Sequence, residues 1–321
     1  MSMQQLKDLI DQIEQRRKER SVYQLGLVAF VAVVMLGGGT LVMPFFQAPS
    51  AVTTSEQQLE PTAFDTVDLS AKAAIVYDLT TGDVLYAKNA EAQLPLASLT
   101  KLLTLFAASE MLTKDSPIVM TAKALATEGE NGFQAGETFT FEEAARLALV
   151  GSSNDAAAAI AEAATKIAHA ANGTSLLASA ASAIGLTQTY ALNGTGLDEN
   201  GAISGCYGSA HDIALLASAL LKRVPGIMRA SIDPYVTATS LSGNSYTLKN
   251  TNPEISHIPG LLLSKTGYTD LAGGNLAVVF DAGIGHPVAI VVLGSTKDER
   301  FTDVERLVRA TSAQFAGLQL P

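Results

Sequence analysis

A long segment without any charged residue, close to the N-terminus, most constrains what this 321-residue chain can fold into. No Asp, Glu, Lys or Arg occurs from Ser21 to Ser55, and residues 22–46 are mostly apolar. As a helix, residues 22–46 would be about 37 Å long, which is enough to cross a hydrocarbon core of about 30 Å. We therefore expect residues 21–47 to form a transmembrane signal anchor.

Four basic residues directly before this segment indicate its orientation. They are Arg16, Arg17, Lys18 and Arg20, and the positive-inside rule keeps such residues in the cytoplasm. We expect residues 1–20 to be cytoplasmic and the chain to cross the cell membrane once, with the remainder in the periplasm or on the outer surface. The alternatives are a signal peptide cleaved near residues 47–51 and a buried core helix. The apolar run is longer than the usual 7–15 residues of a signal peptide, so we prefer the anchor.

Composition excludes several classes of function. A formal net charge of -10 argues against a dedicated nucleic-acid binder, because such a protein needs a basic face. With 48% apolar and 16% charged residues, the chain is too hydrophobic for disorder. The single cysteine, Cys206, forms neither an intramolecular disulfide nor a thiolate metal site. The four histidines show no metal-ligand spacing, so we expect neither a metal nor a cofactor.

The rest of the chain divides into a linker and one large domain. Residues 48–68 are rich in Ser, Thr, Pro and Ala and predict a linker, and residues 69–321 predict the catalytic domain. Alternating or continuous apolar runs predict strands over 73–77, 84–87, 261–264, 276–280 and 288–293. Helices are predicted over 98–112, 141–150, 155–168, 175–184, 210–221 and 303–315. Two early strands, a helical middle and late strands predict an α+β fold with an antiparallel β-sheet flanked by helices.

A serine and a lysine at the start of the first predicted helix suggest nucleophilic catalysis. Ser98 and Lys101 are three residues apart and therefore neighbours on one helix face. A buried amine beside a hydroxyl can take its proton and make the serine a nucleophile. Serine is also an ordinary helix N-cap, so this pair alone carries little weight.

Two later segments carry chemistry of a compatible kind. Ser152 and Asn154 lie between two predicted helices, where a hydroxyl and a carboxamide can relay a proton and bind a peptide. The ordinary alternative is that one of them caps the helix starting near Asp155. Lys265 and Thr266 end a predicted strand and suit an anionic group, while Gly267 lets another backbone come close.

Together the three segments form the ordered set S-x-x-K, S-x-N and K-T-G, which is known from penicillin-binding proteins and class A β-lactamases. Over residues 65–316 the sequence resembles the serine D-Ala-D-Ala carboxypeptidases, the low-molecular-mass penicillin-binding proteins. The sequence also resembles the family's patterns around these motifs, at residues 134–140, 196–198, 209–212, 265–270, 272–276 and 300–303. The resemblance implies a β-lactamase/transpeptidase-like fold, a peptidoglycan stem peptide as substrate, and β-lactams as inhibitors.

The resemblance also implies catalytic roles. Ser98 would attack the carbonyl between the last two D-alanines, with Lys101 as its base. Ser152 would pass the proton toward the departing D-alanine. Water would then hydrolyse the acyl-enzyme without a metal or an organic cofactor.

The remaining residues carried over from the family would bind the substrate. Asn154 would hydrogen-bond the peptide, and Lys265 would supply positive charge. Thr266 and Arg300 would hold the terminal carboxylate. The backbone N–H groups of Ser98 and Tyr268 would form the oxyanion hole. Tyr268 stands where relatives often have histidine, so we assign its side chain no titrating role.

Three other functions remain open from the sequence. A D,D-endopeptidase would share the mechanism and differ only in the leaving group. A class A β-lactamase would need a glutamate in an E-x-x-L-N loop, and here Thr187–Tyr190 precede Ala191-Leu192-Asn193 without one. A non-catalytic wall-binding protein would be expected to lack a motif residue, and all are present.

Overall fold

An antiparallel sheet of five strands organises the part of the chain that the computed structural model describes, residues 62–129 and 131–317. The predicted cytoplasmic segment, the transmembrane anchor and the linker up to residue 61 lie outside the described residues. Within those residues, no helix is both long enough and apolar enough to cross a membrane.

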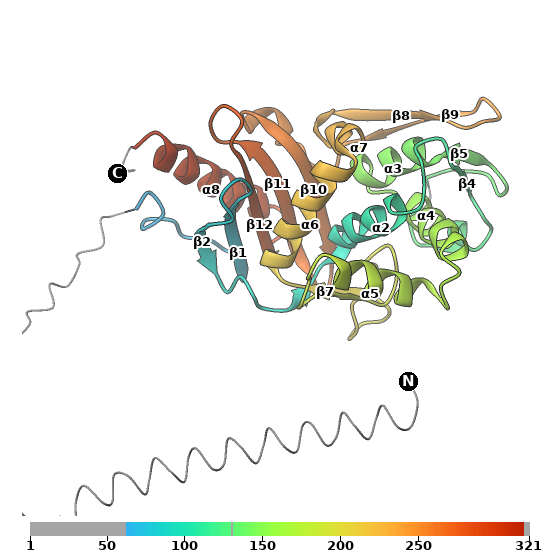
Figure 1. Cartoon of the computed structure of the whole chain (residues 1–321), viewed down its shortest axis with the longest axis horizontal. Helices are drawn as coiled ribbons and strands as arrows, with labels where there is room; N and C mark the ends of the chain where they lie inside the picture. Colours follow the sequence, from blue (N-terminus) through green and yellow to red (C-terminus); the bar gives the residue numbers. More distant parts are fainter. Residues whose placement is uncertain (1–61, 130, 318–321) are drawn as a thin grey trace, which may run out of the picture. The chain divides into compact units, whose positions relative to one another are not determined.

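The sheet joins both ends of the described chain (Figure 1). Its strand order is β10-β11-β12-β1-β2, and every neighbouring pair is antiparallel. The strands are β1 (Ala73–Asp78), β2 (Val84–Lys88), β10 (Leu261–Thr269), β11 (Gly273–Asp281) and β12 (Pro287–Ser295). Strand β10, with the third motif, therefore lies at one edge of the sheet.

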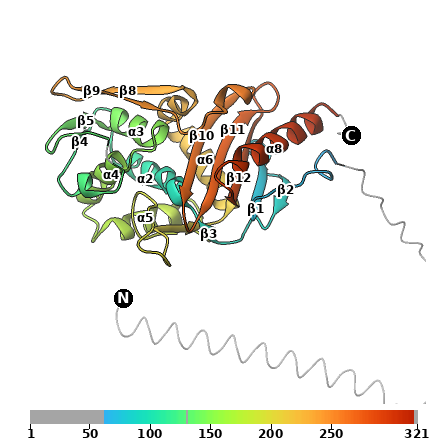
Figure 2. The same ribbon diagram turned by 180° about the vertical axis from the view of Figure 1, so that it is seen from behind.

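Both faces of the sheet are covered, which explains why its central strands are apolar at almost every position. On one face, Ile290 and Val292 of β12 pack in a cluster with α8 (Glu299–Phe315). On the other face, Val291 and Leu293 belong to the larger core that includes α2 (Thr100–Ser109) and α6 (Ala210–Arg223). Figure 2 shows α8 lying across its face of the sheet.

The helical region lies beside the β10 edge and is built from short helices. These are α3 (Phe141–Val150), α4 (Asn154–Ile167), α5 (Gly173–Ala183) and α7 (Pro225–Arg229), with the 3₁₀ turns η1 (Ala97–Leu99), η2 (Ala124–Ala126), η3 (Ala230–Ile232) and η4 (Ile255–His257). The Thr140 side chain accepts from the backbone N–H of Glu143 to cap α3, and Ser153 does the same from Ala156 for α4. Such caps satisfy backbone donors that would otherwise lack partners.

Three small sheets complete the fold. Strands β3 (Leu94–Pro95), β7 (Cys206–Gly208) and β6 (Tyr190–Ala191) form one, and β4 (Pro117–Val119) pairs with β5 (Thr138–Thr140). The third is a hairpin of β8 (Tyr235–Thr239) and β9 (Ser245–Lys249), packed mainly on α3 and not predicted from the sequence. Its outer face is lined by exposed Thr and Ser side chains.

The predicted α+β architecture is confirmed, and several boundaries differ. Strand β10 continues through the third motif to Thr269 instead of ending at Ser264. The last helix begins at Glu299, so it includes Arg300. The folded unit also begins before residue 69, because Ala63 and Phe64 are buried in the cluster beneath α8.

Candidate active site

Ser98 lies in a 3₁₀ turn directly before α2, not in the α-helix itself as expected. The preceding Ala97 has a φ of +47°, a conformation that costs free energy for a residue with a side chain. The turn places the Ser98 hydroxyl 2.7 Å from the ammonium nitrogen of Lys101, which donates to it. The predicted contact between Ser98 and Lys101 is therefore present.

Lys101 is fully buried at 0% exposure. Its Nζ also donates to Asn154 Oδ1 at 2.7 Å and to the backbone carbonyl of Thr195 at 2.9 Å. Burial lowers the pKa of Lys101 from 10.5 to about 7, because an apolar surrounding disfavours the charged amine. A lysine with this pKa can accept a proton at neutral pH.

Ser152 is held in a strained conformation with a φ of +57°. Its hydroxyl accepts a hydrogen bond from Lys265 Nζ at 2.8 Å, and the same ammonium donates to the backbone carbonyl of Thr266. Lys265 is 1% exposed. Burial, followed by the charges of Lys101 and Arg300, holds the pKa of Lys265 well below 10.5.

Asn154 is the first residue of α4 and connects Lys101 to a neighbouring loop. Its Oδ1 accepts from Lys101, and its Nδ2 donates to the Glu128 carbonyl at 2.7 Å. Capping of α4 is performed by Ser153, so neither Ser152 nor Asn154 is used as the helix cap. Both side chains are thereby available to the cluster.

Gly267 allows β10 to lie directly against the turn that carries Ser98. A Cβ atom at this position would lie 2.8 Å from the Leu96 carbonyl oxygen and 3.2 Å from the Ser98 nitrogen. The first separation is shorter than real Cβ contacts, and the second is shorter than most of them. The glycine of the third motif therefore sets the distance between the strand and the nucleophile.

The remaining third-motif contacts extend the site along β10. Thr266 is 4% exposed, and its hydroxyl donates to the Thr251 hydroxyl at 2.6 Å. Arg300, buried at 6% exposure, donates through Nη1 to the Gly267 carbonyl at 2.7 Å. Tyr268 is 45% exposed, and the Lys297 ammonium lies 5.3 Å from its ring centre.

The cluster concentrates positive charge. The hydrogen bonds made by Lys101, Lys265 and Arg300 go to uncharged oxygen atoms of hydroxyl, amide and carbonyl groups. The Nε atom of Arg300 is buried without a hydrogen-bond partner among the described residues. Such an arrangement favours an anionic ligand.

Several residues of the site were not identified as functional from the sequence. Thr251 and the Thr195 carbonyl contact the motif residues directly. Asp198 accepts from Thr269 Oγ1 at 3.0 Å and so fixes the end of β10. Asn275 is buried at 0% exposure and donates to the Pro95 carbonyl. Asp198 and Asn275 lie in sequence patterns that match the family, but these patterns pointed to no role for them. Nothing in the sequence marked Thr251 as functional.

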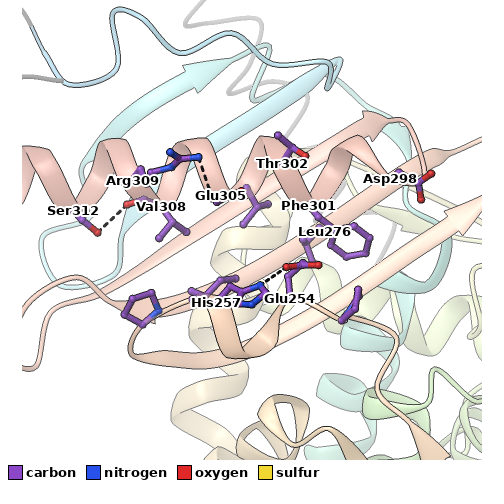
Figure 3. Close-up of a pocket in the computed structure, with 14 residues that line it drawn as sticks. Glu254, His257, Leu276, Asp298, Phe301, Thr302, Glu305, Val308, Arg309 and Ser312 are labelled. Carbon is purple, nitrogen blue, oxygen red and sulfur yellow. Dashed lines mark hydrogen bonds and ion pairs between the residues drawn. The ribbon is translucent and has the colours of Figure 1, made fainter. Parts of the chain in front are cut away.

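Two of the cavities in the described part of the chain differ in how close they lie to the motif residues. One of about 1020 Å³ adjoins the cluster, because Thr195 and Glu128 are in its wall. The other, of about 740 Å³, lies between α8 and residues 253–259 (Figure 3). Around this second cavity, Glu254 pairs with His257 and Glu305 with Arg309. Its lining includes none of the motif residues.

Comparisons with known proteins agree with this geometry. A family model described as D-alanyl-D-alanine carboxypeptidase matches residues 55–297. The D-alanyl-D-alanine carboxypeptidase DacF of Bacillus subtilis is 30% identical over 262 residues, covering 76% of this chain and 63% of the relative. A D-alanyl-D-alanine endopeptidase of Pseudomonas aeruginosa is 29% identical over 253 residues, covering 75% and 77%. The chain thus spans just under two thirds of the length of the first of these relatives.

Solved structures show the same fold. Penicillin-Binding Protein D2 from Listeria monocytogenes, in its ampicillin-bound form, matches with a TM-score of 0.62 and 28% identity. That match covers 76% of this chain and 98% of the other. The D-alanyl-D-alanine carboxypeptidase DacD from Francisella tularensis matches with a TM-score of 0.69 and 25% identity, covering 84% and 76%.

Proposed function

This chain belongs to the D-alanyl-D-alanine carboxypeptidase family, and we propose that it removes the terminal D-alanine from peptidoglycan stem pentapeptides. The observation that carries the proposal is the hydrogen bond between Ser98 and a fully buried Lys101. A serine hydroxyl becomes a nucleophile when a neighbouring base accepts its proton, and burial gives Lys101 the pKa to do so.

Acylation begins when Lys101 takes the Ser98 proton and the hydroxyl oxygen attacks the carbonyl between the two D-alanines. The backbone N–H groups of Ser98 and Tyr268 stabilise the resulting oxyanion. Gly267 keeps these two segments close enough to share one oxygen atom. Because the donors belong to fixed backbone, they need little reorganisation during the reaction.

Departure of D-alanine requires a proton on its nitrogen. Ser152 delivers it from its hydroxyl, which hydrogen-bonds to Lys265, and is reprotonated with the proton that Lys101 took from Ser98. Lys101 is then neutral again. The carbonyl carbon remains bonded to Ser98 Oγ as an ester. Water, deprotonated by Lys101, then hydrolyses this ester and releases the shortened peptide.

The free carboxylate of the last D-alanine orients the substrate in the site. It binds beside the Thr266 hydroxyl in the positive field of Lys265 and Arg300, while Asn154 hydrogen-bonds the peptide backbone. Penicillin carries a comparable carboxylate and acylates Ser98 in the same way. The ampicillin-bound form of the Listeria protein supports this extension.

The test is to incubate the chain with a pentapeptide ending in D-Ala-D-Ala and, separately, with a labelled penicillin. We expect D-alanine release and a covalent label at Ser98, both abolished in Ser98→Ala. Intact labelling without D-alanine release would refute the carboxypeptidase activity. Rapid turnover of the penicillin would instead indicate a β-lactamase.

A second candidate is a D,D-endopeptidase, supported by the similar Pseudomonas aeruginosa protein of that name. It would cleave a D-Ala bond whose leaving group is a cross-linked peptide. Cross-linked muropeptide dimers distinguish the two activities, because a carboxypeptidase leaves them intact.

We also propose that residues 21–47 anchor the chain in the membrane with the catalytic domain outside the cytoplasm. The support is the uncharged run and the basic residues before it. Protease added to the outer face should degrade the domain and leave a small membrane fragment. A mature N-terminus near residues 49–52 would refute the anchor and favour a cleaved signal peptide.

A further inference from the structure

The loop after β9 places a second threonine hydroxyl against the third motif. Thr251 Oγ1 lies 2.6 Å from Thr266 Oγ1 and accepts its hydrogen. Thr251 is half-buried, whereas Thr266 is almost fully buried. The two hydroxyls come from segments that do not pair as strands, so a fixed loop must hold them together.

Two buried asparagines fix this loop. Asn250 donates through Nδ2 to the carbonyls of Ser231 and Asp233. Asn252 donates to the Ser264 hydroxyl of β10 at 2.8 Å. The Thr251 N–H itself donates to the Val150 carbonyl at 3.2 Å, two residues before Ser152. Thr251 is therefore tied both to β10 and to the segment that carries the second motif.

The direction of the hydrogen bond determines what Thr251 can do. A hydroxyl that accepts a hydrogen bond keeps its own hydrogen for donation. The hydrogen of Thr266 is directed at Thr251, so the hydrogen of Thr251 is the one that the pair offers to a ligand. The neighbouring ammonium of Lys265 donates to the Thr266 carbonyl at 2.8 Å, which places positive charge beside the same pair.

We infer that Thr251 donates this hydrogen to the terminal carboxylate of the substrate, so that this chain recognises its free C-terminus through a Thr251 hydroxyl that Thr266 orients. The inference rests on the proposed function and names an additional substrate-binding residue for it. A hydrogen bond to a charged group is stronger than one between neutral groups. The contribution of Thr251 should therefore depend on the substrate's charge.

The experiment compares Thr251→Val with Thr251→Ser on an acylated L-Lys-D-Ala-D-Ala peptide and on its C-terminal amide. Valine keeps the shape without the hydroxyl, and serine keeps the hydroxyl. We expect Thr251→Val to lower kcat/KM for the free acid by about tenfold or more, with little change for the amide. Thr251→Ser should resemble the wild type on both peptides.

Thr247→Val is the matched control, because Thr247 lies on the exposed face of β9, where its hydroxyl hydrogen-bonds that of Thr237 on β8. It should leave both peptides unaffected. Equal losses for acid and amide in Thr251→Val, or no loss at all, would overturn the inference.

A second measurement separates this inference from the proposed function. We compare the rates at which labelled penicillin and its methyl ester acylate Ser98. This repeats the comparison between a free acid and a neutral ligand without any peptide reaction. A wild type that is acylated but releases no D-alanine refutes the carboxypeptidase activity alone. The inference then still requires Thr251→Val to slow acylation by the acid more than by the ester, and equal slowing overturns it.

Discussion

Asn275 donates a hydrogen bond from its side-chain amide to the backbone carbonyl of Pro95, with a separation of 3.0 Å. Its side-chain oxygen accepts from the Gly294 N–H at 2.8 Å. One buried side chain of β11 thus ties β12 to the segment that leads to Ser98. On its other side, this segment is held by the bond from the Leu96 N–H to the Cys206 carbonyl.

Replacing this amide should displace the nucleophile as well as weaken the fold. Asn275→Ala leaves two buried backbone groups without partners, which costs about 2–4 kcal/mol in the free energy of unfolding. We expect slower acylation of Ser98 by labelled penicillin even well below the melting temperature. Unchanged acylation in the folded variant would show that Asn275 stabilises the protein without positioning Ser98.

Gly267→Ala tests how closely β10 must approach the nucleophile. The added methyl group would lie 2.8 Å from the Leu96 carbonyl oxygen, so strand and turn must separate. A displacement near 1 Å can reduce a reaction rate by about a hundredfold, and we expect a loss of that size in acylation. Gly226→Ala is the control, because a Cβ atom there would have open space around it in the part of the chain that the structure describes. Similar rates in both variants would contradict this reading.

The pH dependence of acylation should follow the protonation of Lys101. Burial lowers its pKa to about 7, and only the neutral amine can take the Ser98 proton. Below about pH 7 the rate should therefore rise about tenfold per pH unit, and above it the rate should level off. Stopped-flow labelling with a penicillin between pH 5 and 9 measures this rise in the acylation rate. A flat profile in a range where the protein stays folded would exclude Lys101 as the base.

The candidate active site was predictable because its members occur in short sequence patterns. Ser98 and Lys101 are close in sequence, and the resemblance to a known family placed Ser152, Asn154, Lys265 and Thr266 beside them. The structure joins these six residues by hydrogen bonds into two groups, one of Ser98, Lys101 and Asn154 and one of Ser152, Lys265 and Thr266. The positions of the transmembrane and cytoplasmic segments stay predictions.

The supporting contacts were not predictable, because they join single residues that are distant in sequence. Asn275 and Pro95 are separated by 180 positions, and Thr251 resembles any loop threonine. The full length of β10 was missed because its polar motif lies at the sheet edge, where the side chains serve the site instead of a core. The β8–β9 hairpin was missed although its residues alternate between exposed and covered positions.

Thr266→Ala and Arg300→Ala should discriminate between substrates with and without a free carboxylate. Thr266 lies beside Lys265, whereas Arg300 contacts the Gly267 carbonyl. We therefore expect the larger loss of kcat/KM on the free acid for Thr266→Ala and a milder one for Arg300→Ala. The C-terminal amide should be hydrolysed at nearly unchanged rates. If Thr266→Ala slows both peptides equally, the carboxylate-anchor role is wrong.

Binding of the free acid should also be coupled to proton uptake by Lys265. In the empty site, burial and the charges of Lys101 and Arg300 hold its pKa well below 10.5. An arriving carboxylate favours the charged amine and raises that pKa. Between the pKa values of the free and bound states, each binding event must therefore take up a fraction of a proton.

Calorimetry of peptide binding to Ser98→Ala, in buffers with different ionisation enthalpies and across pH 6–9, measures this uptake without turnover. The free acid should show it, and the C-terminal amide should not. Lys265→Arg, made in the Ser98→Ala background, is the control, because a guanidinium stays charged throughout this range, so uptake by residue 265 should disappear. Equal uptake with acid and amide would mean that the carboxylate does not bind near Lys265, because only a charge close to the amine shifts its pKa appreciably.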